Sequence, residues 1–273
     1  MGDAWMPLDL LLLIYLSAAA NGLLIGAISL PLIISRSILF ALTMTHSILG
    51  GAILGVYLNE VLGISLPVPV TAFLMALILS ILVAELSERI FSEDVSIALV
   101  VALATTITVV FSYLLAKASS TGLSLAWVYV AGTSAVATLG DLQRTLTGLV
   151  ITAPLMHLIS GEIKYIAFDR DGAEAMGINT RLYRYLFFAL GSLAASILSM
   201  SIGVLATHVL LAIPGAIAVR FFKRRLFAAS YLSATSLSLG GYALAQVMNI
   251  PPSGGIGILS AIAVIGMVVA RES

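Results

Sequence analysis

The stretch ALTMTHSILGGAILGVYL, residues 41–58, combines an apolar run with a regular stripe of small side chains. The run is close to the roughly 20 residues that a helix needs to cross the hydrocarbon core of a bilayer. Ser47, Gly51 and Gly55 are spaced four apart, so a helix places them along one face. Small residues in such a stripe allow a second helix to approach closely. The stretch therefore predicts a membrane-spanning helix that packs tightly against a neighbouring helix.

The composition of the whole chain is that of a membrane protein. Of its 273 residues, 60% are hydrophobic and 10% are charged, whereas soluble domains usually carry about 25% charged residues. Thirteen Lys and Arg balance thirteen Asp and Glu, so no basic excess points to a nucleic-acid partner. The chain contains no cysteine, which excludes disulfides, thiolate metal sites and thiol nucleophiles. We therefore expect a multi-pass protein of the cell (inner or plasma) membrane, surrounded by lipid.

Nine apolar runs are close to the length of a membrane span. The division between the sixth and seventh runs, around SMSIG, is the least distinct. The expected fold is therefore all-α, with about eight to nine transmembrane helices in a single transmembrane domain over residues 1–273. In the seventh run, Pro214 removes a backbone donor and Gly215 follows it, so we expect a broken helix there. The nine runs are residues 9–33, 38–58, 67–86, 95–116, 145–162, 183–202, 204–219, 227–247 and 255–270.

The positive charges lie on alternate connections between these runs. Lys117 and Arg144 fall on one side of the predicted bundle, and the other eleven Lys and Arg fall on the opposite side. Because Lys and Arg collect on the cytoplasmic side, the N-terminus is predicted outside and the C-terminus in the cytoplasm. The longest connection, residues 117–143, is then outside, and Trp127 and Tyr129 predict short helices at the outer interface. The cytoplasmic set is Arg36, Arg89, Lys164, Arg170, Arg181, Arg184, Arg220, Lys223, Arg224, Arg225 and Arg271.

Few residues of this chain could perform catalysis. It has three histidines, and it lacks the G-x-x-x-x-G-K-[ST] loop that cradles nucleotide phosphates. It also lacks the H-E-x-x-H pattern of a zinc-dependent intramembrane protease. We therefore predict that the chain is not an enzyme.

His46 lies inside the apolar run quoted above. Ionisable side chains at membrane depth are costly and usually face a cavity or a polar partner. A neutral imidazole that only hydrogen-bonds to neighbouring hydroxyls is the structural alternative. The functional interpretation is a polar site at His46, with the hydroxyls of Thr43, Thr45 and Ser47 beside it.

His208 repeats this pattern in GVLATHVLLAIPGAIAVRF, residues 203–221. Its run is the one predicted to break at Pro214, and broken helices at membrane depth line cavities. His157, in APLMHLISGEI, is the third histidine, and for it we favour a structural role.

The segment FDRDGAEAMGINTRLYRY, residues 168–185, predicts a short cytoplasmic helix. Asp169 or Asp171 can cap its start, and Gly177 suits a left-handed stop. Ala173 and Met176 fall on one face at i and i+3, which predicts a small apolar patch among charges. The segment is either a simple connection or a docking element for a soluble partner, since helices laid in grooves are a recurrent recognition mode.

These motifs together resemble the membrane permease subunits of the zinc, manganese and iron importers of the ATP-binding-cassette class, over essentially the whole chain. The matching motifs are TMTHSILGGAILG (43–55), FDRDGAEAMGI (168–178), IGVLATHVLLAIPGAIAVRF (202–221) and NIPPSGG (249–255). The resemblance implies a homodimer with a central path, one cytoplasmic ATP-binding subunit per chain and an extracellular solute-binding protein. It implies no tightly bound cofactor, because the divalent ion (Zn, Mn or Fe) is the cargo. The implied ATPase-coupling helix comprises Asp169, Asp171, Ala173, Glu174, Ala175, Met176 and Gly177.

Three residues depart from the pattern of that family. The family places an Asp where this chain has Leu42, commonly a Pro at Gly50, and a Ser at His208. Losing a carboxylate removes a hard anionic ligand, whereas an added imidazole suits Zn²⁺, Fe²⁺ or Ni²⁺. We therefore hypothesise that His208 partly replaces the missing acid and binds the metal with His46, helped by Thr43, Thr45 or Ser47.

Two alternative functions remain at the level of sequence. The same architecture could carry an iron chelate or a cobalamin-like cargo, which would need a wide aromatic or polar path. The chain could also be an ATP-independent carrier or channel. Neighbouring genes for an ATPase and a binding protein would favour the importer over an independent carrier.

Overall fold

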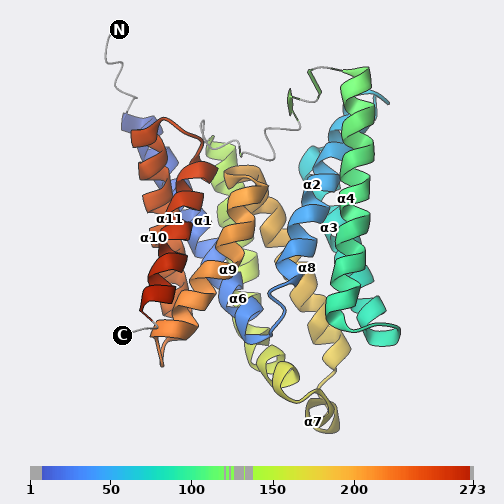
Figure 1. The fold of residues 1–273 in the computed structure, drawn as a ribbon, viewed down its shortest axis with the longest axis vertical. Coiled ribbons are helices and arrows are strands. Elements are labelled where there is room, and N and C mark those ends of the chain that lie inside the picture. Colours follow the sequence, from blue (N-terminus) through green and yellow to red (C-terminus); the bar gives the residue numbers. More distant parts are fainter. Residues whose placement is uncertain (1–7, 120, 123, 126–131, 133–137, 271–273) are drawn as a thin grey trace.

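The computed structural model describes residues 8–119, 121–122, 124–125, 132 and 138–270. Its regular elements are helices, arranged as one bundle of long, roughly antiparallel segments (Figure 1). They are α1 (Leu8–Ile34), α2 (Phe40–Glu60), α3 (Val68–Arg89), α4 (Glu93–Ala118), α6 (Leu139–Phe168), α7 (Arg170–Ala175), α8 (Thr180–Ile202), α9 (Val204–Phe221), α10 (Leu226–Met248) and α11 (Pro252–Val269).

The predicted all-α polytopic fold is confirmed. Eight of the described helices, all except α7 and α10, are long and apolar enough to cross a membrane. The 23-residue α10 packs along α1, and two of its serines hydrogen-bond to the backbone of α1. Ser238 Oγ donates to the Ala18 carbonyl at 2.7 Å, and Ser230 Oγ donates to the Gly26 carbonyl at 2.9 Å. Because these hydroxyls are satisfied inside the bundle, α10 fits at membrane depth despite its lower hydropathy.

The long helices form two packed groups. In Figure 1, α3 and α4 lie on one side of the bundle with α2, and α10 and α11 lie on the other with α1. The first group also includes α8, which contacts α2 and α3, and the second includes α6 and α9, which contact α1. The groups meet where α8 contacts α6 and where α2 and α8 contact α9. The chain enters α1 at one end of the bundle and leaves α11 at the opposite end (Figure 1), as an odd number of crossings requires.

The small residues of α2 lie against α3 and α4. A Cβ added at Gly51 would lie 2.7 Å from the Thr71 carbonyl oxygen and 2.8 Å from Ala72 Cα, both on α3. At Gly50 it would lie 3.2 Å from the Ala104 carbonyl oxygen on α4. The backbone of α2 therefore approaches both helices of the α3–α4 hairpin more closely than a larger residue would allow.

The predicted break near Pro214 is wrong, because α9 runs without interruption from Val204 to Phe221 with Pro214 inside it. A neighbouring helix supplies a partner for the backbone next to the proline. Ser29 Oγ on α1 accepts from the Gly215 N–H at 2.8 Å. Ser233 Oγ on α10 lies 3.3 Å from the Pro214 carbonyl oxygen but only 2.8 Å from the Ala229 carbonyl oxygen of its own helix. Such side-chain partners are what make proline tolerable in a membrane helix. The actual interruption is at Gly203, whose φ of +86° separates α8 from α9.

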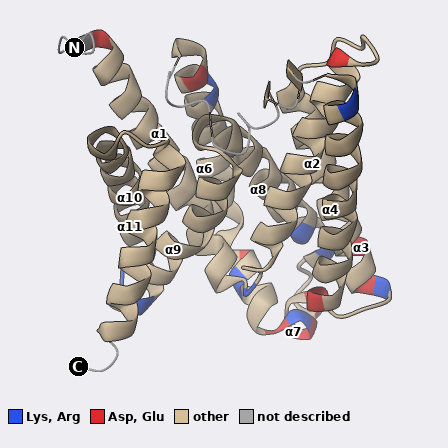
Figure 2. Cartoon of the chain, turned by 45° about the horizontal axis from the view of Figure 1, so that its top comes forward, with Lys and Arg blue, Asp and Glu red and all other residues tan. Residues whose placement is uncertain are grey.

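Charged residues gather at the ends of the bundle, as Figure 2 shows, and most of them lie near the end that carries α7. Of the two basic residues predicted for the opposite end, Arg144 lies in the first turns of α6 and Lys117 in the last turn of α4. The short interfacial helices predicted around Trp127 and Tyr129 fall outside the described residues, as does Arg271.

We expect Gly51→Ala to lower the stability of the protein by about 1–3 kcal/mol, the usual cost of overpacking. The added methyl group would meet backbone atoms of α3, which cannot rotate away. Gly161→Ala in α6 is the matched control, because an added Cβ there has no atom within 4 Å. Thermal unfolding in detergent measures both variants, and equal melting temperatures for the two would contradict the packing described here.

Candidate functional site

Thr45 on α2 and His208 on α9 are joined by a hydrogen bond between Thr45 Oγ1 and His208 Nδ1, 3.0 Å apart. Thr45 Oγ1 also lies 3.0 Å from the Ala41 carbonyl oxygen and 3.2 Å from that of Leu42. A hydroxyl has one proton, and a carbonyl can only accept. When Thr45 donates to its own helix, it accepts from His208 Nδ1–H. The neutral imidazole of His208 then carries its proton on Nδ1 and leaves the lone pair of Nε2 free.

The neutral ring of His46 is held in the same tautomer by its own helix. Its Nδ1 lies 2.9 Å from the Leu42 carbonyl oxygen, which can only accept, so Nδ1 carries the proton and Nε2 is unprotonated in the neutral ring. Metal-binding histidines typically donate their second ring N–H to a carbonyl or carboxylate in this way. Leu42 stands at the position where the family has an acid, and its backbone oxygen orients the His46 ring by accepting this hydrogen bond.

The two imidazoles are held by the same turn of α2. Both side chains are half-buried. His46 Nδ1 lies 2.9 Å from the Leu42 carbonyl oxygen. Thr45 Oγ1, which is bonded to His208 Nδ1, lies 3.2 Å from that same oxygen. Among the described residues, no group of three or more His, Asp or Glu side chains could hold a metal ion. One chain therefore brings together His46, Thr45 and His208, which supply two free imidazole nitrogens and one hydroxyl oxygen.

Thr43 and Ser47 lie on another side of α2. Both are fully buried, and their hydroxyls have no hydrogen-bond partner among the described residues. Ser47 shares the stripe of Gly51 and Gly55 that packs on α3, and it points about 160° away from Thr45 at roughly 100° per residue. No hydrogen bond connects either hydroxyl to His46 or His208 in the described part of the chain. Their predicted part in metal binding stays a prediction.

His157 on α6 has different surroundings. Its ring stacks on Phe227 with centroids 4.1 Å apart and lies nearly parallel to Tyr231 at 5.8 Å. Its Nδ1 is 2.8 Å from the Ala153 carbonyl oxygen, and the side chain is exposed on the bundle surface. These contacts are aromatic packing between α6 and α10, away from the α2–α9 site.

The short helix α7 has the capping predicted for it. Asp169 Oδ1 accepts from the Gly172 N–H at 2.9 Å, and Gly177 ends the turn with a φ of +81°. The predicted apolar patch is not formed, because Ala173 is completely buried whereas Met176, just beyond α7, is 58% exposed. The remaining predicted members of this segment, Asp171, Glu174 and Ala175, are exposed.

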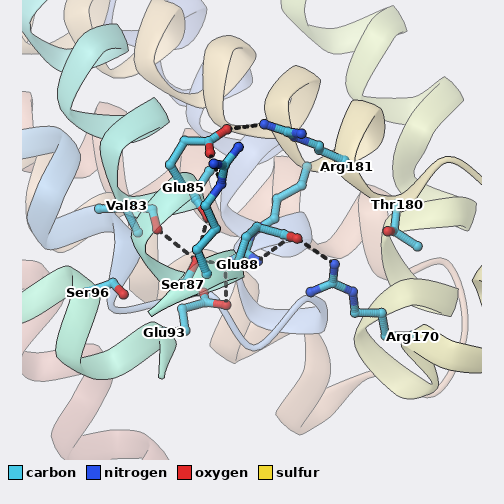
Figure 3. A network of polar contacts seen from close by, with 12 residues as sticks. Val83, Glu85, Ser87, Glu88, Glu93, Ser96, Arg170, Thr180 and Arg181 are labelled. Atoms are coloured by element: carbon cyan, nitrogen blue, oxygen red, sulfur yellow. Dashed lines mark hydrogen bonds and ion pairs between the residues drawn. The ribbon is translucent and has the colours of Figure 1, made fainter. Parts of the chain in front are cut away.

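An ion-pair network holds the α7 end of the molecule together, and Figure 3 shows Glu85 reaching toward Arg181 of α8 and Glu88 toward Arg170 of α7. Glu88 at the end of α3 pairs with Arg170 of α7 at 2.7 Å and with Arg184 of α8 at 3.2 Å. Arg184 also pairs with Glu93 of α4 at 3.0 Å, and Arg181 pairs with Glu85 of α3. From the sequence, these arginines served only to predict the orientation of the chain. The three acids around the α3–α4 turn, Glu85, Glu88 and Glu93, were a signal in the sequence that the arginines had partners there.

The network also changes the ionisation of the exposed groups on α7. Glu88 raises the pKa of the Arg170 guanidinium by a hydrogen bond to it. The pKa of Glu174 is lowered, first by the hydroxyl of Thr180 and then by Arg170. Both groups are therefore charged at neutral pH.

The chain is thus a multi-span helical bundle with two histidines inside its spans and a capped, charged helix at one end. A family model described as the ABC 3 transport family matches residues 8–271, and the chain belongs to this family. It is therefore a permease-type component of an ABC transporter.

Two solved structures share the fold. PsaBC from Streptococcus pneumoniae in complex with Fab is similar with a TM-score of 0.79 and 19% identity, over 97% of this chain and 93% of that chain. An inward-facing protein described as a metal-chelate type ABC transporter is similar with a TM-score of 0.72 and 17% identity, over 98% of this chain and 89% of that chain. No curated protein matches the chain.

We expect Thr45→Val to lower the free energy of unfolding by about 0.5–1.5 kcal/mol, because it removes the hydrogen bond that His208 makes to α2. Thr43→Val is the matched control. Its hydroxyl is buried without a partner in the described chain, so its loss should leave stability unchanged or raise it slightly. Thermal unfolding in detergent measures the difference. A Thr43→Val variant less stable than Thr45→Val would contradict the assigned bond.

Proposed function

We propose that this chain is the permease subunit of an ATP-driven importer of divalent transition-metal ions such as Zn²⁺, Mn²⁺ or Fe²⁺. The observation that carries the proposal is the state of the two histidines, His46 and His208, whose Nδ1 atoms are both occupied by hydrogen bonds to α2. Their Nε2 lone pairs are left for a cation. Imidazole nitrogen is a ligand suited to Zn²⁺ and Fe²⁺, and no cysteine is present to hold the ion too tightly for release.

The incompleteness of the site within one chain supports a homodimer. Zinc sites take four ligands, usually nitrogen or sulfur, whereas one chain offers two imidazoles. Two copies meeting at the half-buried face of α2 that carries His46 would supply four imidazole nitrogens around one ion. The two Thr45 hydroxyls would then hold the α9 imidazoles in place.

The charges at the α7 end support the proposed orientation and partners. Lys and Arg collect on the cytoplasmic side of membrane proteins, so α7 faces the cytoplasm and the N-terminus faces outside. There the exposed Ala175 and Met176 would enter a groove of a cytoplasmic ATP-binding subunit, with the charges of Asp171 and Glu174 beside them. An extracellular solute-binding protein would deliver the ion to the opposite end, in the plasma or inner membrane.

A metal chelate is the second candidate cargo, because one of the structures of the same fold is described as a metal-chelate type transporter. A bare ion needs direct ligands, whereas a chelate brings its own. Substitution of the histidines therefore separates the two cargoes.

We expect His46→Ala and His208→Ala each to reduce ATP-dependent metal uptake by at least about 10-fold, because even the loss of a residue that only orients a metal ligand typically costs about 10- to 100-fold. Uptake of Zn²⁺, Mn²⁺ and Fe²⁺ is measured in vesicles containing the permease and its ATP-binding subunit. His157→Ala is the control, and it should transport as the wild type does.

Unchanged uptake in both variants would refute the histidine site. Uptake of a chelate but not of free ions would establish the second cargo, and uptake without ATP would identify an independent carrier or channel.

A further inference from the structure

Glu88 connects three helices at the α7 end of the bundle. Its Oε2 accepts from Arg170 of α7 at 2.7 Å, and its Oε1 accepts from Arg184 of α8 at 3.2 Å (Figure 3). The Glu88 side chain is only 16% exposed. Isolated ion pairs on the surface contribute little to the stability of a protein. The Glu88 carboxylate differs, because it is largely buried and each of its oxygens is paired to a different helix, which fixes its geometry.

The contact extends to both helices of the α3–α4 hairpin. Arg184, with a side chain 17% exposed, also donates to Ser87 of α3 at 2.7 Å and to Glu93 of α4 at 3.0 Å. The last turn of α3 and the first turn of α4 are thereby tied to one another and to α7. Arg170 is the member of this set that lies on α7 itself.

The same hairpin holds the helix that carries His46. Gly51 and Gly55 of α2 leave no room for a Cβ against α3, and Gly50 leaves little against α4. Close-packed contacts of this kind pass on a displacement, because they cannot be compressed. The α3–α4 hairpin therefore touches α7 through ion pairs at one end and α2 through glycines along its length.

We propose that Arg170 is a positioning residue for transport: through Glu88 and the α3–α4 hairpin it couples movement of α7 to movement of α2 and its histidine. The inference rests on the proposed function, because it needs an ATP-binding subunit docked on α7. In this proposal, Arg170 and Glu88 transmit a change in the nucleotide bound to the ATP-binding subunit to the metal site on α2.

A single cysteine can report this coupling, because the natural chain has none. Leu42→Cys places a thiol on the half-buried face of α2, one turn from His46. The rate at which a thiol reagent labels it is measured with and without ATP, in the complex with the ATP-binding subunit. Arg170→Gln and Glu88→Gln are introduced into this background, alone and together. Arg181→Gln is the matched control, because it breaks an arginine–glutamate pair between α8 and α3 without touching α7.

We expect ATP to change the labelling rate in the parent, in the Arg181→Gln control and in Arg170→Lys, which retains a charged donor. Arg170→Gln and Glu88→Gln should each lose most of that change while ATP hydrolysis and complex formation persist. The double variant should lose no more than either single variant, because both residues act through one contact.

A full ATP-dependent change in Arg170→Gln, or an equal loss in Arg181→Gln, would overturn the coupling role. If the parent itself does not respond to ATP, the proposed function and the coupling role fail together. If the parent responds but no metal is taken up, only the assigned cargo fails.

Discussion

The single proton of the Thr45 hydroxyl decides the direction of the hydrogen bond between Thr45 on α2 and His208 on α9, the central contact of this permease. Because that proton can be donated to the backbone of α2, the oxygen accepts from His208 Nδ1, 3.0 Å away on α9. This bond joins the α2–α3–α4–α8 group to the group that contains α1 and α9. It also sets which nitrogen of His208 is left for a ligand. One hydrogen bond thus fixes both a contact between helix groups and the chemistry of the candidate site.

Besides the buried apolar core, to which Phe40, Met44 and Phe188 contribute, close backbone approach holds the helices of the bundle together. Glycines of α2 lie against α3, and Gly22 of α1 would place a Cβ 2.5 Å from Thr235 Cα on α10. Serines complete these contacts by bonding to carbonyls of the neighbouring helix, as Ser230 and Ser238 do. Lipid offers no hydrophobic gain for association, so such packing and hydrogen bonding must supply it. The same contacts link α2 rigidly to the α3–α4 hairpin.

The spans were predictable because hydropathy and the alternation of Lys and Arg are properties of the local sequence. An aspartate cap at the start of α7, at Asp169 or Asp171, and the left-handed Gly177 after its end were predictable for the same reason. The continuity of α9 through Pro214 was not, because Ser29, which accepts from the Gly215 N–H, lies on α1, far away in the sequence. The surroundings of Ser47, whose hydroxyl is buried without a partner in the described chain, were not predictable either, since the identity of the helix facing each side of α2 is a tertiary property. The Thr45–His208 bond is equally non-local, although both residues were named separately.

The central claim is that His46 and His208 of two copies bind one transported ion. Binding of Co²⁺ to the purified permease tests it directly, because its visible spectrum reports the number and type of ligands as ions are counted. The account predicts one ion per two chains with a tetrahedral, nitrogen-rich spectrum, which is lost when both histidines are replaced by alanine. One ion per chain, or a spectrum unchanged by the double replacement, would contradict it.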